Sequence, residues 1–187
     1  MGWTGITIDK SEVKDYIRGL WTATEEDRKR FEVVSQISYG NTYYQAVRNK
    51  EDKTVFANVV LTSYEDGELI YKDIHENMGP GSYTGVSQKF LSLLSETDNE
   101  YAKNWRKGVE KQIKRTKWIK KNLVSSSTVT FNSPLHYAGN KPATEFKLYN
   151  VALKGMHVKL NNGMWGSLPK GWKDMIVAID GKQVPEA

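Results

Sequence analysis

The 187-residue chain contains no cysteine and only three histidines, and it has no long hydrophobic run. Without cysteine it can form no disulfide bond, no thiolate nucleophile and no zinc site built on cysteine ligands. No segment approaches the roughly 18 consecutive apolar residues that indicate a transmembrane helix. The N-terminus also lacks a basic region followed by an apolar stretch, the pattern of a signal peptide. We therefore expect a cytoplasmic protein without a membrane partner.

The positive charge is concentrated in one segment. The chain has 27 basic and 22 acidic residues, a net charge of +5, and residues 103–121 hold nine of the basic residues but a single acid, Glu110. The rest of the chain therefore has 18 basic and 21 acidic residues, a net charge of −3. With 39% hydrophobic and 26% charged residues, the composition is that of a globular protein. The basic segment is thus a local feature, which suggests a local anionic partner.

Alternating apolar residues predict an antiparallel sheet in the first half of the chain. The runs FEVVSQIS and TYYQAVRN flank Gly40-Asn41, and the runs TVFANVVLTSY and ELIYKDIH flank Glu65-Asp66-Gly67. Both connections are typical of hairpins. Four consecutive strands with short turns indicate a four-stranded meander, and helices are expected to cover its inward face.

Helices are predicted on both sides of these strands in the sequence. Asp9 is a candidate N-cap for a helix that runs through Trp21. A short helix is expected in GVSQKFLSLLS, and Thr97 with Glu100 then resembles a capping box that begins a long helix to about Asn122. At 100° per residue, its apolar residues fall on one side and its basic residues on the other. The apolar set is Tyr101, Trp105, Val109, Ile113 and Ile119.

After Ser125 the sequence changes to short β-like runs, TVTF, ATEFKLYNV, MHVKL and MIVAIDGKQV. About 60 residues of this kind predict a small barrel-like or sheet domain. The sequence therefore predicts an α+β fold in two domains. Residues 1–122 form an α+β domain that ends in the long basic helix, and residues 123–187 form a small β domain.

Polar residues gather at the end of the fourth predicted strand. On an extended strand Asp73, His75 and Asn77 would share one face, where they could contribute to a metal or acid–base site. No second histidine lies nearby, so we favour a polar strand end followed by a turn at Gly79-Pro80-Gly81. The glycine-rich loop lacks a P-loop lysine, and no nucleophile elbow occurs. We predict no catalytic residue, no cofactor and no metal. The alternative is a pocket for a nucleotide or another small molecule, with or without hydrolase activity, lined by Asp73, His75, Glu76, Asn77 and Tyr83.

The basic helix carries the main functional prediction. Like charges on one helix face repel each other, and an anionic partner would relieve that repulsion. Trp118 falls among the lysines, where its ring could stack on a base or a cation. A solvated helix face, with Trp118 packed against the second domain, is the plainer interpretation. We predict a surface for nucleic acid or a nucleoprotein, with an acidic protein surface as the alternative, formed by Lys107, Lys111, Lys114, Arg115, Lys117, Trp118 and Lys121.

Four motifs, MGWTG, TYYQAV, YKDIHENMGP and TDNEYAKNWRK, occur in this order within about residues 1–110. Together they resemble a family of uncharacterised proteins from bacteria, phages and other mobile elements, classed as a domain of unknown function. The resemblance implies no reaction and no catalytic residue. It implies either a structural hub or a ligand pocket between sheet and helix, of which we favour the hub. The matching residues are Trp3, Asp73, Glu76, Asn77, Gly79, Pro80, Asp98, Asn99, Glu100, Trp105 and Arg106.

The chain also departs from the family pattern. An aspartate often stands at the position of His75, and a cysteine follows the Gly-Pro pair, whereas this loop reads GPGSYTGVS. Neither His75 nor a thiol is therefore required for a shared chemistry. From the mobile-element setting we predict a binding protein rather than an enzyme, acting in the host cytoplasm if a phage encodes it. Inhibition of host defence, of the anti-CRISPR or anti-restriction type with a CRISPR effector as a candidate target, is the expected role.

Overall fold

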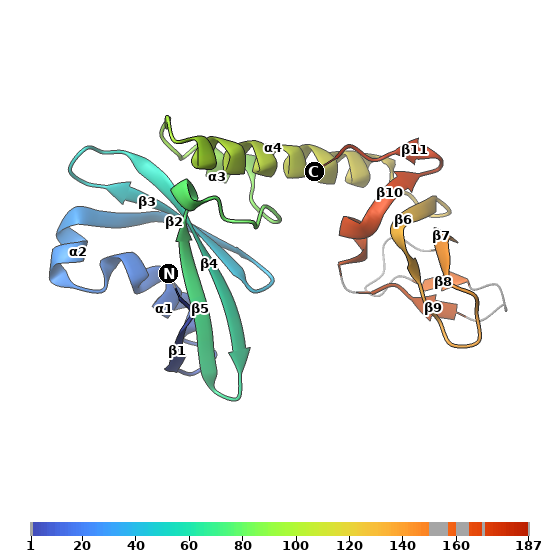
Figure 1. Ribbon diagram of the computed structural model, residues 1–187, viewed down its shortest axis with the longest axis horizontal. Coiled ribbons are helices and arrows are strands. Elements are labelled where there is room, and N and C mark those ends of the chain that lie inside the picture. The colour runs from blue at the N-terminus through green and yellow to red at the C-terminus, as the bar shows by residue number, and fades with distance from the viewer. Residues whose placement is uncertain (1, 150–156, 160–164, 170, 187) are drawn as a thin grey trace. The chain divides into compact units, whose positions relative to one another are not determined.

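The computed structural model describes residues 2–149, 157–159, 165–169 and 171–186 (Figure 1). The fold is mixed α+β with two main antiparallel sheets, so the predicted α+β class is confirmed. The chain divides into two compact units, which we call the N-terminal unit (Met1–Ile113) and the C-terminal unit (Lys114–Ala187). This division falls inside the long helix, whereas the sequence suggested a boundary after the helix, at residue 122.

The N-terminal unit is built on a five-stranded sheet with the order β1-β5-β4-β3-β2. Its strands are β1 (Thr4–Thr7), β2 (Phe31–Tyr39), β3 (Thr42–Asn49), β4 (Val55–Glu65) and β5 (Glu68–His75). The turns at Gly40-Asn41 and Asp66-Gly67 lie where the sequence predicts them. Asp66 and Gly67 both have positive φ, the conformation that a tight two-residue hairpin needs. β1 was not predicted; it pairs with β5 at the edge of the sheet.

Six helical segments surround this sheet. They are α1 (Val13–Gly19), η1 (Leu20–Thr22), α2 (Glu25–Arg30), η2 (Glu76–Met78), α3 (Gln88–Leu91) and α4 (Glu100–Asn122). The predicted end of the long helix at Asn122 is confirmed. Asp9 is not an N-cap, because α1 begins only at Val13 and the Asp9 carboxylate accepts hydrogen bonds from Ser11 instead.

Helices cover both faces of the sheet in the N-terminal unit. On one face Ile17 of α1 packs with Val60 and Leu69 of β4 and β5. On the other face Trp105 and Val109 of α4 are buried in a cluster with Tyr44, Ala57, Val59 and Phe90. The α4 residues lie at the helical spacing that the sequence predicts for its apolar side. Burial against the sheet therefore fixes which side of this half of α4 faces solvent.

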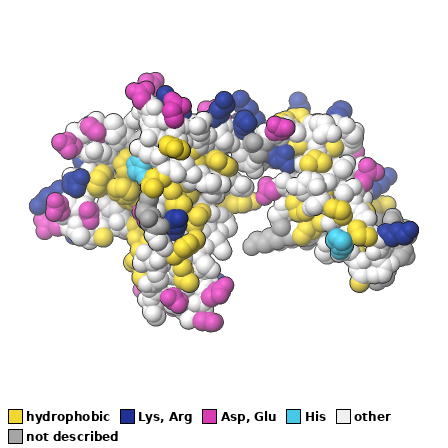
Figure 2. All heavy atoms as spheres, in the orientation of Figure 1, with side chains coloured by type: hydrophobic (Ala, Val, Ile, Leu, Met, Phe, Trp, Pro, Cys, Tyr) yellow, Lys and Arg dark blue, Asp and Glu magenta, His cyan; other side chains and the backbone are white. Residues whose placement is uncertain are grey.

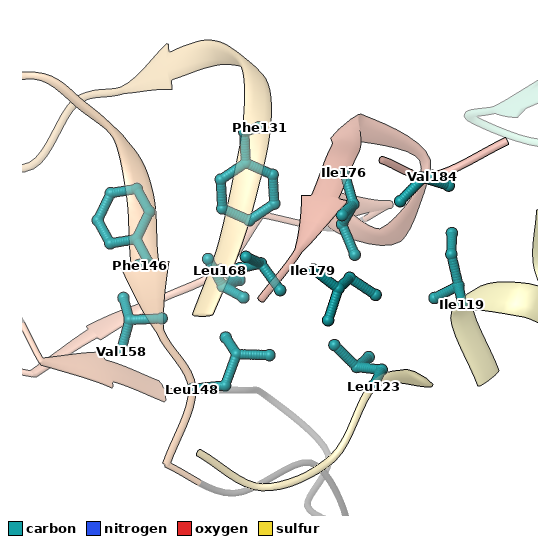
Figure 3. Close-up of a cluster of buried hydrophobic side chains, with 11 residues drawn as sticks. Ile119, Leu123, Phe131, Phe146, Leu148, Val158, Leu168, Ile176, Ile179 and Val184 are labelled. Carbon is teal, nitrogen blue, oxygen red and sulfur yellow. The ribbon is translucent and has the colours of Figure 1, made fainter. Parts of the chain in front are cut away.

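The C-terminal unit holds a second sheet and a smaller ladder. The elements are β6 (Thr128–Leu135), β7 (Ala143–Lys147), β8 (His157–Lys159), β9 (Trp165–Ser167), η3 (Trp172–Met175), β10 (Ile176–Ile179) and β11 (Lys182–Gln183). The four-stranded sheet has the order β11-β10-β6-β7, and β8 pairs with β9. Figure 3 shows the hydrophobic core of this unit, in which Phe131, Phe146 and Ile176 pack with Ile119 near the end of α4 and with Leu123, which follows the helix.

Candidate functional site

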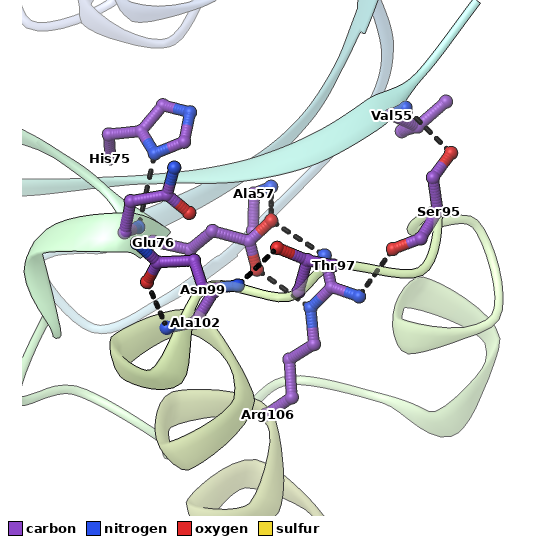
Figure 4. A network of polar contacts seen from close by, with 10 residues as sticks. Val55, Ala57, His75, Glu76, Ser95, Thr97, Asn99, Ala102 and Arg106 are labelled. Carbon is purple, nitrogen blue, oxygen red and sulfur yellow. Dashed lines mark hydrogen bonds and ion pairs between the residues drawn. The ribbon is translucent and has the colours of Figure 1, made fainter.

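A buried ion pair joins the end of β5 to α4 (Figure 4). Glu76, only 1% exposed, accepts hydrogen bonds from Arg106 Nε at 2.8 Å and Arg106 Nη2 at 2.7 Å. The same carboxylate accepts the main-chain N–H of Ala57 in β4 at 3.0 Å, and Arg106 Nη1 donates to the carbonyl of Ser95. A buried charge pair is stable only when additional hydrogen bonds satisfy its remaining groups, and the Glu76 carboxylate here accepts three.

The same region fixes the start of α4. The N-cap of α4 is Asn99, two residues after the predicted Thr97, because Asn99 Oδ1 accepts a hydrogen bond from the N–H of Ala102 at 3.0 Å. Thr97 Oγ1 in turn accepts the N–H of Asn99 at 3.2 Å. With Glu76 and Arg106, these contacts bring together residues of the YKDIHENMGP and TDNEYAKNWRK motifs. We call Glu76, Asn99 and Arg106 the polar hub.

The loop after η2 is also tied down by hydrogen bonds. Trp105 Nε1 donates to the carbonyl of Ser82 at 2.9 Å, and the hydroxyls of Tyr44 and Ser82 lie 2.7 Å apart. The Tyr44 hydroxyl also donates to the carbonyl of Thr84 at 2.8 Å. The glycine-rich loop thus uses its main-chain carbonyls to join β3 to α4. This arrangement gives the loop a structural role. The loop does not form a wall of the predicted pocket.

The prediction that Asp73, His75 and Asn77 share one face of a strand is wrong. The strand ends at His75, and the next residues turn into η2, which leaves Asn77 exposed and buries Glu76. The His75 ring packs on Phe56 with centroids 4.4 Å apart, and Figure 4 shows it turned away from the Glu76 carboxylate. Tyr83 lies elsewhere, against Gly108 of α4. The five residues predicted for the pocket are therefore not gathered around one cavity.

A small cavity of about 200 Å³ lies beside the polar hub, lined in part by His75, Glu76, Asn77, Ser95 and Arg106. It is smaller than the roughly 300–1,000 Å³ usual for ligand sites. Its one buried carboxylate already accepts three hydrogen bonds. Within the described residues, no three histidine, aspartate or glutamate side chains come together in a way that could hold a metal ion. The buried carboxylate of the cavity is thus already engaged by Arg106 and Ala57.

His75 provides a test of this description through pH. Burial lowers its pKa from the ordinary 6.5, and the nearby Glu76 charge opposes that effect only partly. Below pH 6.5 the unfolded chain takes up a proton more readily than the folded one, so this residue makes stability fall as the pH drops from 6.5 toward the folded pKa. We expect His75→Phe, which retains the stacking on Phe56, to lose that part of the pH dependence.

The measurement is the urea midpoint of the wild type and His75→Phe at several pH values between about 5.5 and 7.5. The wild type should lose more stability on acidification than the variant. His136→Phe, at an exposed position of the C-terminal unit, is the comparison variant. Parallel pH profiles for wild type and His75→Phe would contradict the burial of a neutral imidazole.

The basic side of α4 is the other feature that the sequence singled out. Lys107, Lys111, Lys114, Lys117 and Lys121 are all exposed, and they fall within an arc of about 120° around the helix. We call these five residues the lysine face. Figure 2 shows Lys and Arg side chains gathered over α4, with acidic side chains near its beginning. Within the described part of the chain, no acidic side chain forms an ion pair with any of the five.

Acidic residues lie before the lysine face and, at Glu110, within it. Lys103, which precedes the lysine face, forms two ion pairs. Its Nζ lies 3.1 Å from Glu100 Oε1 and 3.9 Å from Asp98 Oδ1. Glu110 is exposed and shares the arc with the lysines. The free positive charge therefore begins at Lys107 and extends over about 21 Å of helix to Lys121, at 1.5 Å per residue.

Arg115 does not lie on this surface, although the sequence placed it there. Its side chain is buried in the C-terminal unit, with Nη1 donating to the carbonyl of Pro185 at 3.0 Å. Its Nη2 donates to the carbonyls of Asp174, at 3.3 Å, and Ile176. Trp118 is partly buried and packs against the hydrophobic core of the same unit. Trp118 therefore follows the plainer interpretation, and neither residue is a free element of the interface.

Comparison with known proteins does not assign the chain to a family. No protein-family model matches the chain, and no curated protein matches it. The resemblance to mobile-element proteins therefore stays a prediction. In the described residues, no helix is both long enough and apolar enough to span a membrane.

Proposed function

We propose that this protein binds nucleic acid through the lysine face of α4, by contacts to the phosphate backbone that do not depend on base sequence. The observation that supports the proposal is the run of five exposed lysines on one helix face without acidic partners in the described residues. Neutralisation of phosphates by such side chains releases counterions and supplies most of the affinity of non-specific binding.

The choice of residue types favours phosphate over other anionic surfaces. Lysine binds phosphate as a flexible point charge, without the fixed geometry of an arginine fork. Protein interfaces are enriched in arginine and aromatic anchors and depleted in lysine at their centre. The lysine face has five lysines and, with Arg115 buried, no arginine. An acidic protein partner is therefore the weaker alternative.

The same surface would allow contact with a nucleoprotein. A CRISPR effector or a restriction enzyme carries bound nucleic acid, and a strip of about 21 Å could follow an exposed stretch of its backbone. This use would agree with the role in host-defence inhibition that the family resemblance implies. It requires phosphate binding first, so the test begins with free nucleic acid.

The test is a charge reversal on the lysine face. The variant carries Lys111→Glu, Lys114→Glu and Lys117→Glu, and the control carries Lys14→Glu, Lys89→Glu and Lys147→Glu, which are exposed outside α4 and change the net charge equally. Binding of labelled single- and double-stranded DNA and RNA is measured across a salt series. We expect the first variant to lose affinity by about 100-fold at low salt, and the slope of log affinity against log salt to fall by about 2–3.

The matched control separates a site from a general charge effect. It should lose at most a few-fold in affinity, because its lysines lie outside the proposed contact surface. Equal losses in the two variants would show that net charge alone drives binding. A wild type that binds none of the four nucleic acids at low salt would refute the proposal and direct attention to an acidic protein.

A further inference from the structure

We propose that the nucleic acid is single-stranded and that two of its bases stack on Tyr101 and Tyr83, beside the lysine face. This inference rests on the proposed function and adds the class of nucleic acid to it. Both tyrosines and the two lysines nearest to them, Lys107 and Lys111, lie in the N-terminal unit. Stacking on exposed aromatic rings next to a positively charged surface is how many proteins bind single strands without reading their sequence.

Tyr101 is the first of the two rings. It belongs to the apolar set that the sequence predicts for the buried side of α4, yet it is 65% exposed, whereas Trp105 and Val109 from the same set are buried. Its ring lies near Gly79, where an added Cβ would be 3.5 Å from Tyr101 Cδ1. The ring is therefore supported at one edge by the turn after η2 and is largely open to solvent.

Tyr83 is the second ring, and a glycine positions it. It comes from the loop after η2 and lies against α4 at Gly108, where a Cβ would be only 2.7 Å from Tyr83 Cε1 and 2.9 Å from Cδ1. Any side chain at residue 108 would displace the ring, so the glycine permits its contact with the helix. Tyr83 remains 38% exposed, which leaves part of the ring accessible.

The two rings lie along one side of α4. Tyr101 and Gly108 are seven residues apart, which is about two turns, so they are about 10 Å apart along the axis and nearly in line. Lys107 and Lys111 lie on the adjacent side, within about 100° of Gly108 around the helix. A strand whose phosphates follow these lysines could thus direct bases toward both tyrosines.

This geometry distinguishes single strands from duplexes. In a duplex the bases are paired and stacked at about 3.4 Å along each strand, so their faces are not available to stack on the two rings. An unpaired strand can unstack and present its base faces to aromatic side chains. Lysines alone would bind both forms, so a preference for the single strand would come from the tyrosines.

The experiment removes the ring and the bases separately. Tyr101→Ala and Tyr101→Phe are compared with wild type for binding to an oligothymidylate, to an abasic strand of the same length and to a duplex. Wild type should bind oligothymidylate about 30-fold more tightly than the abasic strand, Tyr101→Ala should lose about fivefold of that preference because Tyr83 remains, and Tyr101→Phe should retain it. Binding of the abasic strand and of the duplex should not change. Trp3→Ala, at another exposed aromatic that is 58% accessible, is the control.

A second readout locates the contact directly. Single-stranded DNA containing 5-bromouracil, irradiated with the wild-type protein, should cross-link to Tyr101 or Tyr83, as identified by mass spectrometry. If Tyr101→Ala binds oligothymidylate like wild type, or the cross-links map elsewhere, the stacking proposal is overturned while loss of binding in the lysine variant would still support the proposed function. If no nucleic acid binds at all, both proposals fail.

Discussion

Replacement of Glu76 by alanine is expected to lower the free energy of unfolding of the N-terminal unit by about 3–5 kcal/mol. Of the hydrogen bonds described for the Arg106 guanidinium, the substitution leaves only the one to the Ser95 carbonyl, and the charge stays partly buried. It also removes the acceptor for the N–H of Ala57 inside the sheet. An uncompensated buried charge and an unpaired amide are each costly, which places this substitution among the most damaging in the chain.

Urea unfolding would measure the loss of stability, and hydrogen exchange would locate it in the sheet. The amide of Ala57 should lose more protection than its neighbours in β4, because its hydrogen bond goes to Glu76 itself. The matched control is Glu25→Ala, which removes an ion pair at 3.4 Å to Lys29 whose side chains are 80% and 73% exposed. Exposed pairs contribute at most about 1 kcal/mol, so the control should change stability little.

A double substitution distinguishes the pair from its surroundings. Glu76→Ala combined with Arg106→Met removes both charges, so it should be less destabilising than the sum of the two single substitutions. Additive losses would show that the two residues do not interact. A loss below about 1 kcal/mol for Glu76→Ala would contradict the structural hub, and Glu76 would again become a candidate for ligand binding.

Local features of the sequence predicted the parts of the fold that depend on neighbouring residues. The hairpins at Gly40-Asn41 and Asp66-Gly67 depend on the conformations of the turn residues themselves. The extent of α4 to Asn122 follows from helical periodicity. β1 was missed because only four residues, Thr4 to Thr7, form it, and their pairing with β5 bridges more than 60 residues of sequence. No short-range pattern carries such a contact.

The site was predictable to a similar degree. Helical periodicity places the lysine face correctly, because a helix fixes which of its residues share a side. It placed Arg115 and Trp118 with the lysines, since it contains no information about which strands pack on the last turns of α4. The partnership of Glu76 with Arg106, 30 residues apart, was suggested only by their shared presence in the matched motifs. Burial, which decides the role of each charged residue, is a tertiary property.

Removal of the Arg115 side chain should unfold the C-terminal unit more readily without weakening nucleic-acid binding by the folded protein. The guanidinium, 8% exposed, donates to three main-chain carbonyls, of Pro185, Asp174 and Ile176. Hydrogen bonds from a charged donor contribute about 1.5–3 kcal/mol each, and loss of the donor removes this partner from all three carbonyls. Because such contributions are not additive, we expect Arg115→Ala to cost about 3–4 kcal/mol.

The neighbouring lysine supplies the control that separates stability from binding. Lys114→Ala, at an exposed position on the lysine face, should leave stability within about 0.5 kcal/mol of wild type and weaken DNA binding. Arg115→Lys retains the charge but cannot reach all three carbonyls, so it should be less stable than wild type and bind DNA equally well when folded. If Arg115→Lys were as stable as wild type and bound DNA poorly, Arg115 would belong to the contact surface. The two adjacent residues thus test whether positive charge on α4 contributes to binding only where burial leaves it exposed.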